Sequence, residues 1–275
     1  MNKFRKQYSI FVRKIYYKIK FRNIEKELPK IKNNIETINE LINTEKSIIR
    51  FGDGEFFFME GEDLCFQEYN KQLAEMLKQI FYTDIPQLLI GTVWLYYGYK
   101  KDLRYSVYKY ILKFLKEKHN KSLKYYNYNK TYWSSFISIP FSQYEKYPYE
   151  EHYTEIRQIW DSKEITVITG DRVYENIKYN IFDNAKEINY IYGPTTNAYS
   201  QYEELKQKIL NIPQNNILIF ALGPCGKALA FEAFSKGYRV LDLGHIIKDF
   251  DAYNKAINMT EYEVRECLKI FFDSD

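Results

Sequence analysis

The chain has 275 residues, of which 45% are hydrophobic and 28% charged, and its formal net charge is +4. This length predicts one large or two small globular domains, and no apolar run approaches the roughly 18 residues that a membrane-spanning helix needs. The three cysteines, Cys65, Cys225 and Cys267, form no C-x-x-C pair, which excludes a zinc ribbon or a disulfide framework and fits a reduced, cytoplasmic compartment.

The basic charge is concentrated at the N-terminus. Residues 1–24 contain eight Lys and Arg and no Asp or Glu, which leaves 32 basic and 36 acidic residues, a net charge of −4, in the rest of the chain. This mildly acidic body does not support a nucleic-acid-binding surface. Apolar residues recur at helical spacing within residues 4–21, which predicts a basic amphipathic helix; they are Phe4, Phe11, Val12, Ile15 and Ile19.

We expect this helical arm, residues 1–45, to precede a catalytic domain of residues 46–275. Residues 1–23 suit the inner face of a membrane, because basic side chains meet anionic lipids there while apolar ones enter the interface. They suit a protein groove equally well, on the body of the chain or on a second subunit. The N-terminus does not have the pattern of a secretory signal, because charges interrupt its apolar residues.

After the arm, a second helix is expected at residues 25–43, and the pattern then changes to strands separated by helices. Short apolar, β-branched runs predict strands at residues 47–51, 88–94, 133–139, 164–169, 187–192, 216–222 and 238–243. Helices are expected at residues 71–82, 103–118, 199–210 and 227–236. This alternation predicts an α/β fold, a Rossmann-like, mostly parallel sheet with helices on both faces, preceded by the helical arm.

In such sheets, ligands bind beyond the carboxyl ends of the strands. Polar residues and glycines gather after the predicted strands, and this clustering predicts a binding site; the residues are Asp53, Glu55, Asp171, Asn197, Gly223–Lys227 and Asp242–His245. His119 and His152 fall in polar stretches, so we expect them to be exposed and give them no role.

The segment from Arg50 to Glu55 reads Arg-Phe-Gly-Asp-Gly-Glu and places two carboxylates after a strand. Gly52 and Gly54 let the backbone turn tightly and approach a ligand, and Mg²⁺ or Mn²⁺ takes one or two carboxylates plus substrate phosphates. An ordinary Asp-Gly turn has the same appearance, so these residues alone leave both interpretations open.

Two further strand ends carry a similar choice. The strand at residues 217–222 leads through Gly223 and Pro224 to Lys227, where a helix N-terminus and a cation would suit a diphosphate, although a plain strand-to-helix connection also needs Gly and Pro. After the last strand, Asp242 could bind a ribose or a metal, and His245 a phosphate or an acceptor. With one histidine in the candidate site and no usable cysteine, a zinc site is not expected. No G-x-S-x-G elbow is present, so a hydrolase of that type is not expected either.

Five motifs occur in order: RFGDGEF, TGD-R-x-Y-E-N, GPxxNAY, ALGPCGKALA and GYRVLDLGH. Together, over residues 47–250, they resemble the GT-D-type bacterial glycosyltransferase family, formerly a domain of unknown function. The family's D-x-E element matches Asp53 and Glu55, which the resemblance makes metal ligands, and its Asp-x-Gly-His element matches Asp242, Gly244 and His245. Its Gly-Pro-x-x-Lys turn matches Gly223, Pro224 and Lys227. After the histidine the run Ile246–Asp251 departs from the family pattern, so no role is assigned to Asp249 or Asp251.

The resemblance implies a Rossmann-like fold, a UDP-sugar donor, Mn²⁺ or Mg²⁺ as cofactor, and an acceptor in bacterial surface glycan or glycoprotein assembly. A metal and a lysine would stabilise the negative charge that develops on UDP as the sugar leaves. Candidate catalytic residues are Asp53, Glu55, Asp242 and His245, and candidate donor-binding residues are Arg50, Gly52, Gly54, Asp171, Asn197, Gly223, Pro224 and Lys227. The general base stays open among Glu55, Asp171 and Asp242. The competing functions are a metal-dependent phosphohydrolase and a non-catalytic nucleotide-sugar-binding module.

Overall fold

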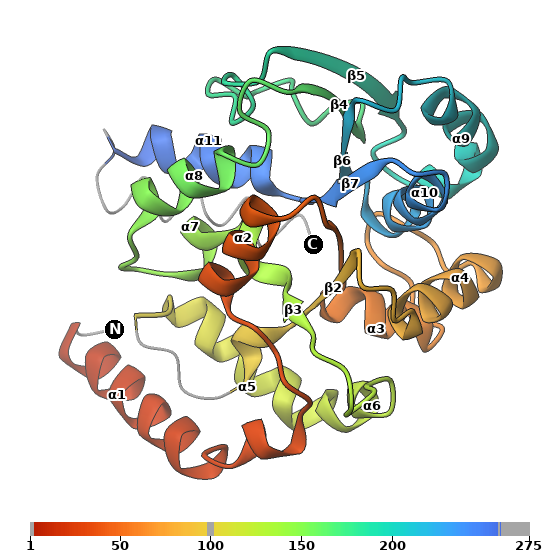
Figure 1. Ribbon diagram of the computed structural model, residues 1–275. Helices are drawn as coiled ribbons and strands as arrows, with labels where there is room; N and C mark the ends of the chain where they lie inside the picture. Colours follow the sequence, from red (N-terminus) through yellow and green to blue (C-terminus); the bar gives the residue numbers. More distant parts are fainter. Residues whose placement is uncertain (1–2, 98–101, 258, 260–275) are drawn as a thin grey trace.

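The computed structural model of the protein describes residues 3–97, 102–257 and 259. Its strands form one all-parallel sheet in the order β3-β2-β1-β7-β6-β4-β5 (Figure 1). The strands are β1 (Ser47–Arg50), β2 (Leu88–Thr92), β3 (Trp133–Ser134), β4 (Glu164–Gly170), β5 (Glu187–Gly193), β6 (Ile217–Ala221) and β7 (Arg239–Asp242). Each lies within or next to a run that the sequence predicts as a strand, and the predicted α/β fold class is confirmed.

Neighbouring residues of each buried strand point to opposite sides of the sheet and are apolar on both, so helices cover both faces. Ile49 joins one core with α3 (Asp53–Met59), α4 (Lys71–Tyr82), α9 (Tyr202–Leu210) and α10 (Gly223–Ser235). Ile48 joins the other core with α2 (Asn34–Asn43), α8 (Tyr149–Arg157) and α11 (Ile246–Ala256). The remaining helices are α1 (Lys3–Lys20), α5 (Tyr105–Glu117), α6 (His119–Leu123) and α7 (Pro140–Gln143), with single turns of 3₁₀-helix, η1 (Ile24–Glu27), η2 (Trp94–Tyr96), η3 (Ser135–Ser138) and η4 (Ala198–Gln201).

The order in which the chain adds strands to the sheet reverses between β1 and β7. From β1 the chain proceeds through β2 to β3 at one edge, whereas β4 to β7 lie on the other side. The register between β1 and β7 contains the single pair Ile48 and Leu241, so the two strands diverge just before their carboxyl ends. A reversal of strand order opens a crevice for ligands in α/β sheets, and it identifies where the site is to be sought.

Helix α1 lies at the periphery of the molecule, beside α5 (Figure 1). The buried ring of Tyr17 contacts Tyr108 of α5, with 6.1 Å between ring centroids, and its hydroxyl donates a hydrogen bond of 2.9 Å to the carbonyl of Tyr96. The arm is therefore packed onto the body through one face. No helix among the described residues is long and apolar enough to cross a membrane.

Two predicted elements of the N-terminal half are wrong in extent. The helix expected at residues 25–43 begins only at Asn34, where Asn33 and Glu36 form a reciprocal capping box, and Pro29 lies in the non-helical stretch before it. The strand expected at residues 133–139 ends at Ser134, because the Ser134 hydroxyl accepts a hydrogen bond from the Phe136 backbone and starts η3.

Two strand-to-helix connections are tighter than the sequence suggests. The segment from Gly52 to Glu55 is the start of α3, where a turn was expected, and α10 begins at Gly223, four residues before the expected start at Lys227. Both differences place candidate residues in the first turn of a helix. They follow from the two glycines and Pro224, which residue patterns assign to turns but which also occupy helix N-termini readily.

The expected exposure of His119 and His152 is wrong, since both are buried. His152 Nε2 lies 2.7 Å from the Ile137 carbonyl and Nδ1 lies 3.0 Å from the Tyr147 hydroxyl. Burial lowers the pKa of His152 to about 4. The polar sequence around it belongs to a short helix, α8, whose inner face is apolar.

Candidate active site at the β1–β7 crevice

Arg50, the last residue of β1, bridges to Asp242, the last residue of β7. Its backbone N–H donates to Asp242 Oδ2 at 3.0 Å, in the position where a backbone carbonyl would otherwise continue the ladder. Its guanidinium donates to the carbonyl of Asp242, to that of Ser135 and to the Ser138 hydroxyl. Gly244 has a φ of +48°, and a Cβ there would collide with the guanidinium. These hydrogen bonds hold the Arg50 side chain in one position and engage its donors.

Lys227 lies in the first turns of α10. Its ammonium lies 3.0 Å from Glu55 Oε1 and 3.5 Å from Asp242 Oδ2, and all three side chains are buried. Burial alone would lower the pKa of Lys227, but the charges of Asp242 and Glu55 outweigh it and hold that pKa above the ordinary value. A fixed positive charge therefore lies at the carboxyl end of the sheet, where the strand order reverses.

Glu55 links this lysine to the start of α3. Its Oε2 accepts a hydrogen bond of 2.7 Å from the Gly52 N–H, and Oε1 pairs with Lys227. A Cβ on Gly52 would lie 3.1 Å from Oε2, so the absence of a side chain lets the carboxylate close over the helix end. Glu55 is at once a helix cap and the partner of a buried cation.

Asp53, one helical position before Gly54, has partners of a different kind. Its two carboxylate oxygens accept hydrogen bonds from the hydroxyls of Tyr96, at 3.1 Å, and Tyr110. Burial raises the pKa of Asp53 above its ordinary value, while the hydrogen bond from Tyr110 acts in the opposite direction. Within the described part of the chain, Asp53 is held by two tyrosine hydroxyls and is not paired with a cation.

Asn197 and Gly223 shape the rim of the site. Asn197 has left-handed backbone angles, with φ 52° and ψ 39°; its N–H donates to the Phe66 carbonyl at 2.8 Å and its Oδ1 accepts from the Glu68 N–H at 2.8 Å. This clasp fastens the α3–α4 loop, and the Phe66 ring then lies over Gly223, where a Cβ would approach within 2.9 Å. Asn197, expected to bind the donor, is engaged in holding an aromatic ring beside the N-terminus of α10.

The contacts of Asp171, another candidate residue, lie outside the group formed by Lys227, Glu55 and Asp242. Asp171 is exposed, and its Oδ1 accepts from the Thr195 hydroxyl at 2.6 Å and from the Thr195 N–H at 3.1 Å. The hydrogen bonds from Thr195 lower the pKa of Asp171. His245 is exposed and precedes α11 as its N-cap residue. The structure brings together Arg50, Gly52, Glu55, Lys227, Asp242 and Gly244, with Asp53, Gly54, Gly223 and Pro224 in the same two helix starts.

The acidic residues after His245 have structural partners. Asp249 is fully buried; its carboxylate accepts from the backbone N–H groups of Phe141 and Ser142 and from the Tyr153 hydroxyl. Asp251 accepts from the N–H groups of Lys178 and Tyr179. The carboxylates thus satisfy backbone donors of α7 and of the loop after β4.

The donor set tests whether Mg²⁺ or Mn²⁺ fits here. No group of three or more His, Cys, Asp or Glu able to hold a metal gathers within residues 3–97, 102–257 and 259. Asp53 and Glu55 supply two carboxylates, and an ion of this kind takes one or two carboxylates together with substrate phosphates and water. These two carboxylates do not form a complete protein cage, and an ion bound by them would take its remaining ligands from a nucleotide diphosphate and water.

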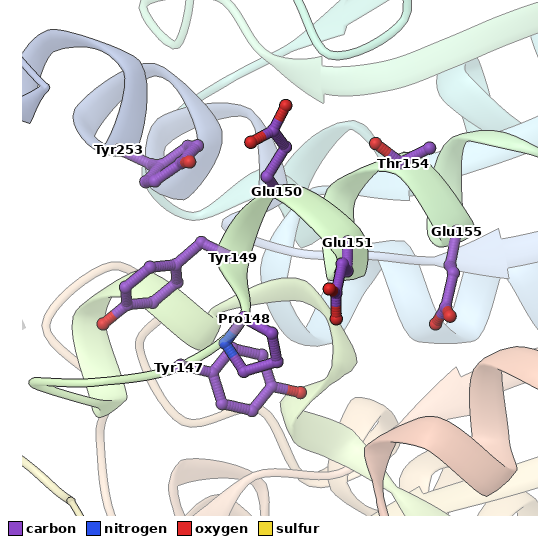
Figure 2. Close-up of a pocket in the computed structure, with 8 residues that line it drawn as sticks. All are labelled: Tyr147, Pro148, Tyr149, Glu150, Glu151, Thr154, Glu155 and Tyr253. Carbon is purple, nitrogen blue, oxygen red and sulfur yellow. The ribbon is translucent and has the colours of Figure 1, made fainter.

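A hollow on the surface of the protein lies elsewhere. It measures about 770 Å³, lies at the start of α8 and is bordered by Tyr253 of α11; its lining is Tyr147, Pro148, Tyr149, Glu150, Glu151, Thr154, Glu155 and Tyr253 (Figure 2). None of these residues is among the candidate residues that follow the strands. The candidate site therefore lies away from this hollow and is recognised by its buried charges.

Comparison with known proteins identifies the family of the chain. Residues 48–266 match the family model described as the glycosyltransferase GT-D fold, and the chain belongs to this family. It is 28% identical over 220 residues to a probable glycosyl transferase, Gly, of Streptococcus gordonii, and 26% identical over 229 residues to glycosyltransferase GlyD of Streptococcus pneumoniae serotype 4. These matches cover 78% and 82% of this chain but 32% and 28% of the relatives, so the chain spans about a third of their length.

Solved structures agree with this assignment. A glycosyltransferase from Streptococcus sanguinis, of the domain of unknown function 1792, superimposes with a TM-score of 0.75 at 25% identity, covering 83% of this chain and 85% of the other. A structure described as that domain's distinct glycosyltransferase fold gives a TM-score of 0.77 at 25% identity, covering 88% and 90% of the two chains. The expected GT-D family is confirmed.

Sequence reasoning missed several residues that complete the site. Tyr96 and Tyr110 are two of 28 tyrosines and belong to none of the five motifs, and Ser138 lay in a stretch expected to be a strand. One signal was available for Tyr96, because it follows β2 and thus lies at the carboxyl end of a strand. Tyr110 lies on α5, far along the chain from Asp53, and no local pattern points to it.

Proposed function

We propose that the chain transfers a hexose from a UDP-sugar to a glycan, glycoprotein or lipid-linked acceptor in bacterial surface glycan assembly, with Mn²⁺ or Mg²⁺. Family membership makes the chain a glycosyltransferase. The names of the streptococcal relatives give glycosyl transfer but neither donor nor acceptor. The diphosphate part of the donor is argued from the charges of the site, and the hexose and the acceptor from the resemblance to the family.

The observation that carries the proposal is the buried ammonium of Lys227 at the start of α10. A helix N-terminus and a fixed cation together suit a diphosphate, because both present positive charge to its oxygens. When the bond between sugar and phosphate breaks, the leaving diphosphate gains negative charge. A cation held in place by Glu55 and Asp242 stabilises that charge without having to reorganise.

Asp53 and Glu55 would hold the metal ion together with the donor phosphates. The bound ion supplies charge neutralisation at the leaving diphosphate. Asp53 is already presented by Tyr96 and Tyr110, whereas Glu55 would share its carboxylate between Lys227, the Gly52 N–H and the ion. Arg50 fixes the position of Asp242 and thereby that of Lys227.

The position of Phe66 supports the proposal that a nucleotide binds at the same place. Its ring lies against Gly223 at the start of α10 and is held there by the Asn197 clasp. An aromatic face beside a diphosphate site suits stacking of a nucleobase. The competing phosphohydrolase would need a larger set of metal ligands than the described residues bring together.

The test is a screen of nucleotide sugars with Mn²⁺, in which UDP release is measured with and without acceptor saccharides. We expect slow release from one UDP-sugar, accelerated by its acceptor, with the sugar recovered on the acceptor. Release that no acceptor accelerates, with free sugar as the product, would favour the hydrolase. Tight UDP binding with no turnover of any UDP-sugar would favour a non-catalytic binding module.

A further inference from the structure

Helix α1 carries a continuous stripe of exposed apolar side chains. Of the fourteen exposed large apolar side chains in the described part of the chain, six lie on this one helix, with exposed fractions between 41% and 68%. They are Tyr8, Phe11, Val12, Ile15, Tyr16 and Ile19. Single exposed apolar residues are common on protein surfaces, but a contiguous set of this size marks an interaction surface.

The stripe faces away from the body. At about 100° per residue, its six members fall within an arc of roughly 140°, and Tyr17 falls on the opposite side of the helix. Tyr17 is buried against Tyr108 of α5. The two interpretations of this arm from sequence therefore apply to different faces of one helix: one face packs on the protein and the other is open to a partner.

Basic side chains border the stripe on both sides. Arg13 lies on one margin and Lys14 and Lys18 on the other, as helical spacing places them. Arg13 and Lys14 are steadied over the rings of Tyr105 and Tyr108 of α5, at 5.9 and 5.0 Å from the ring centroids. Residues 1–24 include no Asp or Glu. An apolar stripe between two cationic margins is the pattern of a helix that lies in the interface of an anionic bilayer.

We propose that the exposed face of α1 docks the enzyme onto an anionic lipid surface, with the six stripe residues inserted between headgroups and the basic margins on the lipid phosphates. The charge pattern favours this partner over a second copy of the chain. A symmetric pairing of two α1 helices would bring together two segments that have basic residues but no acidic ones, and like charges would oppose it.

The docking helix is attached to the elements that hold the active site. The Tyr17 hydroxyl donates to the carbonyl of Tyr96, and the Tyr96 hydroxyl donates to Asp53. Helix α5, on which α1 packs, also supplies Tyr110 to Asp53. Docking would therefore place the catalytic crevice at a fixed position relative to the lipid surface. This step rests on the proposed function and assigns the acceptor to the lipid-linked or membrane-proximal class.

Vesicle binding tests the docking surface without any donor or acceptor. Full-length protein is sedimented with vesicles of phosphatidylcholine, with and without phosphatidylglycerol, at low and high salt. We expect binding only with phosphatidylglycerol, weakened by salt because screening reduces the attraction. The combined change Phe11→Ser, Ile15→Ser and Ile19→Ser should reduce binding at least tenfold, and Lys18→Gln should reduce it roughly fivefold. A matched control is Ile35→Ser with Ile85→Ser, which alters exposed apolar residues on other elements and should bind as the wild type does.

The outcomes separate the alternatives. Wild-type protein that stays in the supernatant with phosphatidylglycerol at low salt overturns the proposal. A triple variant that binds vesicles normally overturns it too, and a change from dimer to monomer in that variant, measured by light scattering, would assign the stripe to a second copy. UDP release from a soluble donor reports on the catalytic proposal separately, so a failure of either proposal is recognised without the other.

Discussion

The ammonium of Lys227 lies 3.0 Å from Glu55 Oε1 and so joins the N-terminal turn of α10 to that of α3. The two helices follow β6 and β1, which belong to the two halves of the sheet on either side of the reversal in strand order. The pair therefore ties the halves together at the place where a nucleotide diphosphate would bind. Its removal should affect both stability and ligand affinity, and the two effects can be separated.

Lys227→Met should weaken UDP binding about tenfold or more and should also destabilise the protein by about 3 kcal/mol. The stability loss arises because Glu55 and Asp242 would be left buried without their cation. The second change in Lys227→Met with Glu55→Gln removes one of these carboxylate charges, so it should recover part of the stability but none of the affinity. Titration calorimetry and urea denaturation measure the two quantities. Recovery of UDP affinity in the double variant would contradict a role of Lys227 at the diphosphate.

Asp53→Asn should abolish most of the activity while leaving the protein as stable as the wild type, or more stable. Burial raises the pKa of Asp53, which means that the charged form is unfavourable in the folded state, and the amide removes that charge. Loss of a metal-binding carboxylate should cost at least a hundredfold in turnover, whereas Tm should not fall. Turnover near that of the wild type would remove Asp53 from the metal site.

Activity should disappear with excess EDTA and return with Mn²⁺ or Mg²⁺, because two carboxylates and the donor phosphates form an oxygen-only ligand set. The protein alone should bind Mn²⁺ weakly, and UDP should strengthen that binding, since the described residues offer no complete cage. Calorimetry of Mn²⁺ with and without UDP measures the coupling. Full activity in EDTA, or equal Mn²⁺ affinity in both conditions, would contradict this arrangement.

The expected fold class was correct because the alternation of apolar runs with helical segments is a strong local signal, and β4 at Glu164–Gly170 is a clear example. The site was predictable as a set of strand ends but not as a set of roles. Arg50 and Asn197 were expected to bind the donor, and the structure adds hydrogen bonds to partners 85 to 192 residues away in sequence. Contacts over such separations leave no periodic trace.

Helix α7 was missed for a related reason. Helix α7 comprises four residues and begins with Pro140, so local pattern assigns it to a turn. Its first N–H groups are satisfied by Asp249 of α11, more than a hundred residues away. Asp249→Ala should therefore destabilise the protein by about 2 kcal/mol, the usual cost of leaving buried donors without a partner. Denaturation with urea checks this, with Lys248→Ala, an exposed neighbour, as the control.

Tyr110→Phe should shift the acid limb of the pH–activity profile to higher pH. The hydrogen bond from Tyr110 lowers the pKa of Asp53 against the larger effect of burial, so its loss lets that pKa rise further. Asp53 must be ionised to bind a cation, and more of the protein would be inactive at mildly acid pH. The Mn²⁺ concentration for half-maximal activity should increase in parallel. A uniform loss of turnover at every pH would indicate that Tyr110 supports only the packing of α5.

The pH dependence of stability should reveal two buried groups with opposite effects. Burial lowers the pKa of His152 from 6.5 to about 4, so the folded state binds fewer protons there than the unfolded state, and stability is lost as pH falls through this range. Burial raises the pKa of Asp249 from 3.8 to about 6, so the folded state binds more protons, and stability is gained as pH falls from about 6. The two contributions offset each other between about pH 6 and pH 4.

His152→Gln, whose amide can still donate to the Ile137 carbonyl, leaves the Asp249 contribution alone. Relative to the wild type, the free energy of unfolding of this variant should increase by up to about 1.4 kcal/mol per pH unit as the solution is acidified below pH 6.5. Urea denaturation of both proteins at several pH values measures the difference, and a difference that stays constant with pH would show that His152 does not stay neutral in the folded protein.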